Sequence, residues 1–391
     1  MPDYKILVPP PKRHHTAVIM TLVVVLVVAV GAAAFVVGRH HSTADGAGGK
    51  GGGTSNRTVA VKPLTVVSTV PASGSTNVPS DQVVSVRCSA KVADPPGLPA
   101  FVPPVAGRWV RTGPETLSFQ ATAPFIPTET ETLVIPAGSA GPHGTGGAVL
   151  AAPTTVSFTV TQASTERLQQ LLAELGYLPL SFTPSAPLSS PIEQLTQQAG
   201  TFAWRWPNPP PTLSSLWTEG TEDVITKAAV MNFENQNGLT VDGLAGGQVW
   251  TALLADIATQ KANANPYDYV LVSKQLPENL TLYENGTPVM SDVAVNTGAP
   301  GADTVDGTYP VFEHVVSSRM QGTNPDGSTY DDPAVPWASF FNGGDALHGF
   351  VRATYGSPQS NGCVEMPVAT AAVVYPLTPI GTLVTVVGPA S

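Results

Sequence analysis

One stretch of this sequence limits the rest of the chain more than any other. Residues 17–37 read AVIMTLVVVLVVAVGAAAFVV, 21 residues without a charge. As an α-helix they extend about 32 Å, which matches the roughly 30 Å hydrocarbon core of a bilayer. Three basic residues precede the run and one follows it closely: Lys5, Lys12, Arg13 and Arg39. The sequence therefore predicts a membrane anchor with a cytoplasmic tail at residues 1–16 and everything after it outside the membrane. A cleaved signal peptide is the alternative, but its apolar region is usually only about 7–15 residues long.

The charge of the remaining chain limits its partners. The 391 residues carry 18 Lys and Arg against 28 Asp and Glu, a net charge of −10. Residues 1–62 hold seven of these cations and two of the acids, so residues 63–391 are strongly acidic. A segment with this negative charge repels nucleic-acid phosphates, and we therefore expect no nucleic-acid binding. Two cysteines are too few for a disulfide framework or a Cys-rich zinc site.

A Gly-rich linker at residues 38–62 leads into residues 63–162, which have the pattern of an all-β sandwich. Apolar residues alternate with polar ones over residues 84–92 and again over residues 155–161. Pro and Gly clusters interrupt the chain about every 8–12 residues, as in a sandwich. Cys88 lies on the apolar face, where an inert buried thiol is expected. The opening VVSTVPASGSTNVPSDQVVSV resembles the start of a bacterial immunoglobulin-like (Ig-like) domain.

Residues 164–260 have helical periodicity. Ser164 is a suitable N-cap for a first helix with a leucine stripe, and Thr221 for a second helix that ends near Asn237. A third helix follows the turn Asp242-Gly243. The strings LQQLLAELGYLPL and AAVMNFENQNGLTVDGLAGGQVWTALL resemble the peptidoglycan-binding type 1 domain, a small three-helix module that binds the wall.

The two parts of this module are separated by a Pro-rich insertion, residues 181–217. It carries Trp204, Trp206 and Trp217. These rings either stack on sugar faces or pack onto the helices, and we favour packing because Trp buries well wherever apolar area is available.

Residues 266–391 return to β-structure. Strand patterns occur at residues 269–273 and 280–284, and Asn285-Gly286 between hydrophobic runs predicts a type I′ hairpin. Further strands are expected at residues 289–295, 308–316 and 382–387. Pro367 suits the first position of a short helix through Tyr375. Residues 317–345 are rich in Gly, Pro and Asp, and we expect a long loop there that acts as a lid.

Reactive chemistry in this last segment centres on one cysteine. Cys363 lies in the turn SNGC, and His348 lies in DALHGF, fifteen residues earlier. A cysteine nucleophile needs a base or a positive neighbour, and His titrates near neutral pH. Gly349 and Gly362 let the backbone come close to a substrate, and the turn can direct N–H groups at an oxyanion. From these residues alone, a buried inert cysteine remains the alternative.

The order HG followed by SNGC resembles the signature of the L,D-transpeptidase (YkuD-type) catalytic domain, over roughly residues 266–389. The resemblance implies a mostly-β domain in which Cys363 is the nucleophile and His348 its base. Gly349 would contribute backbone next to the base. The oxyanion hole and the turn that shapes it would come from four consecutive residues: Ser360, Asn361, Gly362 and Cys363.

Two positions depart from that signature, and several others are weaker candidates. Asn361 stands where the family has a second His, and Glu365 where it has Arg or Asn. Met320 and Tyr330 would line the donor site under the lid. Arg352 would meet a peptide carboxylate or be solvated. Two further sets complete the predictions: His314, which either positions His348 or is an ordinary surface or core histidine, and Trp337, Phe340 and Phe341, which we expect in the core.

The fold class that follows is multi-domain: a transmembrane helix, an Ig-like sandwich, a three-helix wall-binding module and a mostly-β catalytic domain. The resemblance implies a cell-membrane L,D-transpeptidase that forms 3→3 cross-links in peptidoglycan by cysteine acyl transfer from tetrapeptide stems. Its partners would be stem peptides, glycan and the membrane, with carbapenems as inhibitors and no cofactor or metal. The alternatives are a non-catalytic peptidoglycan-binding scaffold, and exchange or hydrolysis of wall peptides by the same thiol.

Overall fold

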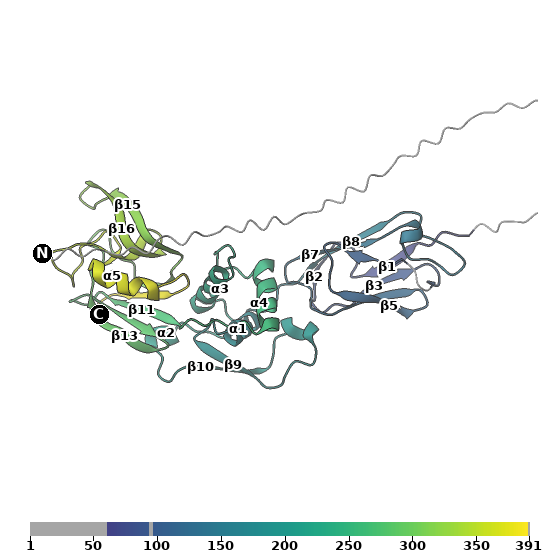
Figure 1. Cartoon of the computed structure of the whole chain (residues 1–391), viewed down its shortest axis with the longest axis horizontal. Coiled ribbons are helices and arrows are strands. Elements are labelled where there is room, and N and C mark those ends of the chain that lie inside the picture. The colour runs from purple at the N-terminus through teal and green to yellow at the C-terminus, as the bar shows by residue number, and fades with distance from the viewer. Residues whose placement is uncertain (1–60, 94–96, 390–391) are drawn as a thin grey trace, which may run out of the picture. The chain divides into compact units, whose positions relative to one another are not determined.

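The computed structural model describes residues 61–93 and 97–389 (Figure 1). The predicted anchor at residues 17–37 and nearly all of the linker lie outside these residues. Within the described part of the chain, no helix is both long and apolar enough to cross a membrane. The anchor therefore stays a prediction.

The first described domain is a sandwich of two four-stranded sheets. One sheet has the order β1 (Val66–Val70), β3 (Val84–Cys88), β6 (Thr116–Ala121), β5 (Gly107–Gly113). The other has the order β2 (Ser75–Val78), β8 (Thr154–Val160), β7 (Thr130–Ile135), β4 (Ala100–Phe101), and a 3-10 turn follows at Gly138–Ala140. The predicted alternation is confirmed, because Val84, Val86 and Cys88 are buried while Arg87 is exposed. The strand ends at Cys88, earlier than the sequence pattern indicated.

Cys88 is fully buried in the core of this sandwich. Burial, and then the charge of Glu115, raise the pKa of its thiol. We therefore expect a water-soluble thiol reagent to leave Cys88 unmodified in the native protein and to modify it after denaturation, which mass spectrometry of the labelled protein checks. Rapid modification of native Cys88 would contradict the burial.

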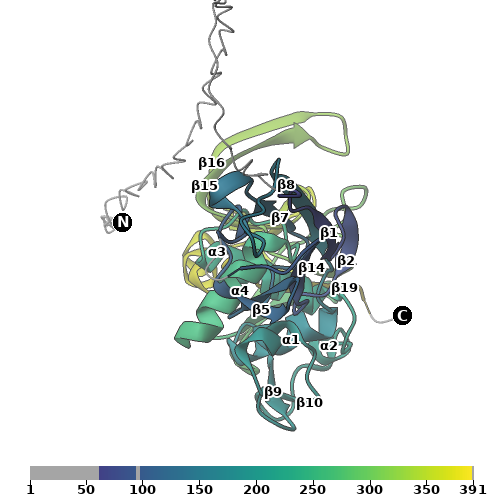
Figure 2. The same ribbon diagram turned by 90° about the vertical axis from the view of Figure 1, so that its right-hand side faces the viewer.

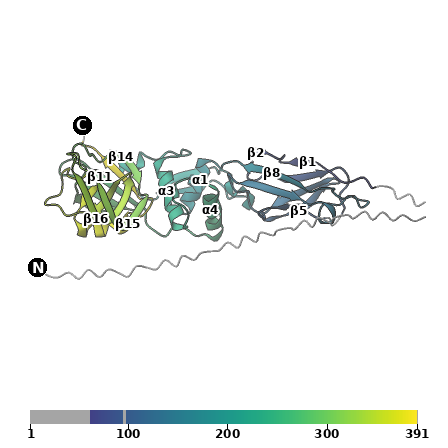
Figure 3. The same cartoon turned by 90° about the horizontal axis from the view of Figure 1, so that it is seen from above.

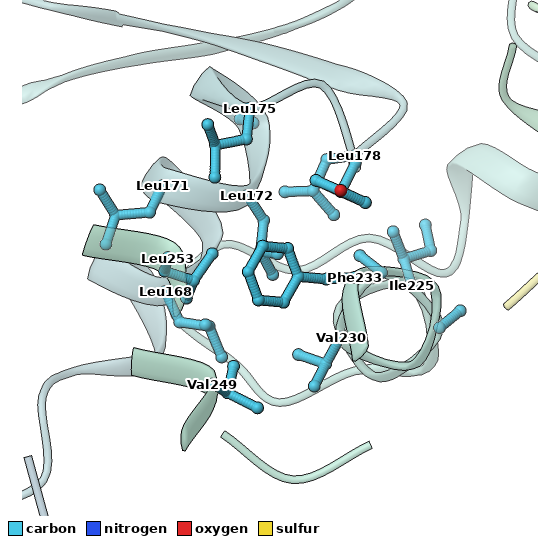
Figure 4. Close-up of a cluster of buried hydrophobic side chains, with 14 of the residues drawn as sticks. Leu168, Leu171, Leu172, Leu175, Leu178, Ile225, Val230, Phe233, Val249 and Leu253 are labelled. Atoms are coloured by element: carbon cyan, nitrogen blue, oxygen red, sulfur yellow. The ribbon is translucent and has the colours of Figure 1, made fainter. Parts of the chain in front are cut away.

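The helical module has the expected three main helices, α1 (Thr165–Glu174), α3 (Val224–Gln236) and α4 (Gly247–Thr259). Ser164 caps α1 by accepting a hydrogen bond from the backbone N–H of Arg167 at 3.1 Å. The cap of α3 is Asp223, which accepts from the Thr226 N–H at 2.8 Å, so the prediction of Thr221 is wrong by two residues. A carboxylate at this position also interacts favourably with the helix dipole. The apolar stripes of the three helices meet in one core (Figure 4).

The Pro-rich insertion is partly regular. Strands β9 (Leu180–Pro184) and β10 (Gly200–Trp204) form an antiparallel pair, with a 3-10 turn at Pro191–Leu195 between them and a short helix, α2 (Pro211–Ser214), after them. Trp204, Trp206 and Trp217 are partly buried and pack against the helical core, as favoured from the sequence. Phe202 and Trp217 have ring centroids 5.3 Å apart. These rings contribute apolar burial to the insertion.

The last domain contains two sheets that enclose a core (Figure 3). The five-stranded sheet has the order β13 (Thr287–Ala294), β12 (Asn279–Glu284), β11 (Asp268–Ser273), β19 (Leu383–Val387), β14 (Gly307–Pro310). The four-stranded sheet has the order β15 (Glu313–Thr323), β16 (Thr329–Asn342), β17 (Asp345–Gly349), β18 (Val364–Met366), and α5 (Val368–Val374) with a 3-10 turn at Tyr375–Leu377 follows it. The predicted hairpin at Asn285-Gly286 is confirmed, since both residues have positive φ values, 48° and 74°. Phe341 is buried and Trp337 packs against the same core.

Two predictions in this domain are wrong. The single strand expected over residues 308–316 is split between β14 and β15, which belong to different sheets, because the ladder of β14 ends at Pro310. The expected loop over residues 317–345 is mostly the long β15–β16 hairpin (Figure 2). Its polar residues pair across the two strands, for example through Arg319 and Asp331 at 2.6–2.7 Å. Pro333 fits because it falls where the pairing register shifts.

The helical module and the last domain share part of one core. Tyr269 on β11 and Leu383 on β19 are buried in the same cluster as the helix residues. The Tyr269 hydroxyl also donates to the Thr212 hydroxyl in α2 at 2.8 Å. Either part alone would therefore expose apolar surface that the native chain buries.

Candidate active site

Two parallel strands bring His348 and the residues after Cys363 together. His348 on β17 lies opposite Glu365 on β18. Cys363 directly precedes β18 and is two residues from Glu365, so the strand alternation directs the Cys363, Glu365 and His348 side chains to one face. The other edge of β18 is held by Asn296, whose backbone exchanges two 2.9 Å hydrogen bonds with Glu365.

The turn before Cys363 is held by hydrogen bonds within itself and from neighbouring loops. The Ser360 hydroxyl donates to the carbonyl of Cys363, and the Thr304 hydroxyl donates to the carbonyl of Gly362 at 2.6 Å. Gly362 has φ +114°, and a Cβ there would collide with the Asp345 carboxylate. The Ser360 hydroxyl therefore helps to hold the turn, and only glycine fits at position 362.

One donor of the predicted oxyanion hole already has a partner within the turn. The backbone N–H of Gly362 donates to the Ser360 hydroxyl at 3.2 Å, so it is already occupied. Among the residues that the structure describes, the N–H groups of Asn361 and Cys363 donate to no other group. Because an oxyanion needs free donors, these two remain the candidates.

Six of the predicted site residues line one cavity of about 220 Å³, whereas Gly349, Ser360 and Gly362 do not. Met320 and Tyr330 reach it from the β15–β16 hairpin, and Arg352 from the segment after β17. The complete lining is Met320, Asn324, Tyr330, Asp332, Val335, His348, Phe350, Arg352, Asn361, Cys363 and Glu365. His314 is not part of it: its Nε2 lies 2.9 Å from the carbonyl of Tyr375, on whose ring it stacks. The structure gives His314 no contact with His348.

Burial disfavours the charged form of both reactive groups. Burial, opposed by a hydrogen bond from the Ala346 backbone and reinforced by Asp345 and Glu365, raises the pKa of the Cys363 thiol to about 12. Burial also lowers the pKa of His348 below its ordinary value. The His348 Nδ1 lies 3.2 Å from the carbonyl of Gly349. A carbonyl only accepts, so this contact assigns the proton to Nδ1 and leaves the Nε2 lone pair as the base.

Arg352 is partly exposed and is paired with a neighbouring carboxylate. Its Nε and Nη2 donate to the two carboxylate oxygens of Glu365, each at 2.7 Å. The guanidinium also lies over the Phe350 ring, 4.7 Å from its centroid. Glu365 is 4% exposed, so a bidentate ion pair compensates its burial beside the thiol. Glu365, which departs from the family signature, is thus neutralised by the guanidinium of Arg352.

Sequence reasoning missed four residues near Cys363: Asn324, Asp332, Asp345 and Phe350. Phe350 had a signal, because positions 348, 350 and 352 share one face if the strand alternation continues beyond His348. Burial raises the pKa of Asp345 to about 6. In the described ranges, no group of three His, Cys, Asp or Glu side chains is placed to hold a metal ion.

Comparison with known proteins gives three family matches. Residues 267–386 match the L,D-transpeptidase catalytic domain, residues 60–160 the bacterial Ig-like domain, and residues 211–253 the putative peptidoglycan binding domain. No curated protein matches this chain.

Several solved structures are similar to parts of the chain. An L,D-transpeptidase from Mycobacterium smegmatis is 14% identical, covering 83% of this chain and all of that one, with a TM-score of 0.27. L,D-transpeptidase 3 from Mycobacterium tuberculosis, in complex with a faropenem-derived adduct, is 12% identical over 82% of this chain and 97% of that one, with a TM-score of 0.29. The catalytic domain of the E. faecium L,D-transpeptidase is 22% identical over 32% of this chain and all of that one, with a TM-score of 0.28. On the family matches, an L,D-transpeptidase catalytic domain is found at residues 267–386 of this chain, together with a bacterial Ig-like domain and a putative peptidoglycan binding domain.

Proposed function

We propose that this protein is a membrane-anchored peptidoglycan L,D-transpeptidase that forms 3→3 cross-links. The observation that carries the proposal is the shared cavity of Cys363 and His348 within the matched catalytic domain. The anchor at residues 17–37 would hold the chain at the cell membrane with its N-terminus inside. A wall-binding module next to the catalytic domain would raise the local concentration of stem peptides.

The reaction we propose has two acyl transfers. His348 accepts the Cys363 thiol proton as the sulfur attacks the carbonyl of the third residue of a tetrapeptide stem. The N–H groups of Asn361 and Cys363 stabilise the oxyanion, and the terminal D-Ala leaves with the proton from His348. A side-chain amine of a neighbouring stem then attacks the thioester, passes its proton to His348, and releases the thiol as the cross-link forms.

Muropeptide profiles test this proposal in cells. Cells without the protein and cells that make Cys363→Ala should lose the same 3→3 dimers. A profile changed by the deletion but not by Cys363→Ala would favour a scaffold.

The pKa shifts of Cys363 and His348 predict a distinctive pH dependence. A neutral imidazole is required, so acylation of Cys363 should fall only below the lowered pKa of His348. Because the thiol pKa is about 12, no second rise is expected between about pH 7 and 9. Stopped-flow acylation by a carbapenem measures this profile. A tenfold rise per pH unit across that range would instead show direct attack by a thiolate without the base.

We also expect residues 61–389 to co-sediment with isolated cell walls through the helical module. A cavity of about 260 Å³ lies between α1, α3 and the loop at residues 243–246, and Leu244 at its edge is 59% exposed. Leu244→Asp should weaken retention by about tenfold or more, because it removes apolar contact and adds a charge. Val305→Asp is the matched control, since Val305 is 54% exposed outside this module. If both variants are retained equally, the prediction that the helical module binds the wall through this cavity is wrong.

A further inference from the structure

The tip of the β15–β16 hairpin is bound to the turn that carries the nucleophile. The Asn361 side-chain amide donates to the Asn324 side-chain carbonyl at 2.6 Å. Asn361 is two residues before Cys363, and Asn324 begins the turn that joins β15 to β16. Both line the cavity that holds Cys363 and His348. This hydrogen bond therefore joins the hairpin tip to the Cys363 turn at the lining of the cavity.

The hairpin tip is built so that Asn324 presents its oxygen. Its backbone N–H donates to the Ser328 carbonyl at 2.7 Å, and its side-chain nitrogen donates to the Ser328 hydroxyl at 2.8 Å. Asp326 accepts from the Ser328 N–H at 2.9 Å and completes the turn. With the nitrogen occupied, the carbonyl oxygen of Asn324 is the group left to face Asn361.

The arms of the hairpin have few other connections to the body near the tip. Pairing of β16 with β17 begins only at Ser339, so residues 329–338 pair with β15 alone. Figure 2 shows the hairpin reaching away from the rest of the domain. A long two-stranded hairpin that pairs with the sheet only at its base can open as a unit. A contact at its tip therefore affects the equilibrium between the closed and open hairpin more than a contact near its base does.

We infer that Asn361 is a positioning residue that latches the hairpin over Cys363 and keeps water from the thioester. The inference rests on the proposed function for what the closed cavity does, while the latch itself is a property of the fold. It also gives the departure from the family signature at position 361 a physical role. Closed, the hairpin holds Met320 and Tyr330 against the cavity and favours the amine acceptor over water.

The latch is tested first without any reaction. A single hydrogen bond between partly exposed groups corresponds to about a 2- to 12-fold change in the closed-to-open ratio. Amide exchange of residues 318–332 should therefore accelerate about 2- to 12-fold in Asn361→Ala and in Asn324→Ala. The double variant should add little to either single one. Asn361→Asp keeps the shape but offers an acceptor to an acceptor, so it should open the hairpin at least as much as Asn361→Ala. Gln321→Ala, an exposed amide on the same hairpin, is the control.

Turnover gives the second readout. The ratio of stem-peptide hydrolysis to transfer should rise by a similar factor in Asn361→Ala and Asn324→Ala, and Asn361→His, which restores a ring N–H donor, should lower it again. Exchange rates equal to those of the native protein would overturn the latch, even if the enzyme turns over. Faster exchange with an unchanged hydrolysis-to-transfer ratio would overturn its role in excluding water. If both variants exchange faster than the native protein but the native protein shows no turnover, the proposed function fails and the latch stands.

Discussion

Replacing Cys363 by Ser is expected to abolish the covalent adduct that a carbapenem forms with this protein. The strained carbonyl of the drug stands in for the stem-peptide carbonyl, and the Cys363 thiol lines the same cavity as His348. Intact-protein mass spectrometry of residues 61–389 should show one adduct in the native sequence. His348→Ala should slow its formation by about 10²–10⁴-fold, since a general base commonly contributes that much.

Cys88→Ser is the matched control for this experiment. Cys88 is fully buried in the Ig-like domain, so its replacement should leave the adduct in place. His314→Ala is the control for the histidine, because His314 bonds to Tyr375 outside the cavity. An adduct on Cys88, or none on a folded protein, would refute the assignment and favour a scaffold. If the adduct forms at the native rate in His348→Ala, Cys363 is still the nucleophile, but a group other than His348 is its base.

Replacing Arg352 by Met is expected to cost more than a surface ion pair would. It leaves Glu365, which is only 4% exposed in the native chain, without its charged partner. Such a loss destabilises a protein by about 3–5 kcal/mol when the pair is fully buried. We expect a value near 3 kcal/mol, because the Arg352 side chain is 30% exposed. The unpaired negative charge would also raise the pKa of the neighbouring thiol further and slow acylation by at least about tenfold.

The pair Arg352→Met with Glu365→Gln separates charge from shape. The double variant should recover most of the stability and the acylation rate, since no buried charge then lacks a partner. Urea unfolding and the rate of acylation, measured for the native protein and both variants, test these effects. Equal losses in the single and double variants would show that Arg352 acts through something other than the charge of Glu365.

Much of the local structure could be predicted because its signals are short-ranged. The alternation around Cys88, the leucine stripe of α1 and the Asn285-Gly286 turn each depend on neighbours in the chain. The candidate nucleophile and base were found in the same way, as one cysteine in a glycine turn and one nearby histidine. The chosen cap of α3 missed by two residues, since Thr221 and Asp223 both suit the position and only the geometry of the turn distinguishes them.

The sequence by itself determined which residue types carry the chemistry and in which segments they stand. Only the tertiary structure decided how they are joined. The Arg352–Glu365 pair, the Asn324–Asn361 contact and the occupied N–H of Gly362 all depend on the register of β17 and β18 and on a hairpin whose strands looked like a loop. Periodicity reports which face of its own strand a residue occupies, but not which distant strand lies beside that face. The strands that lie side by side are those whose pairing buries the apolar residues of the domain in a core. For this reason Arg352, which the sequence predicts to be solvated or to bind a substrate carboxylate, is instead paired with the carboxylate of Glu365.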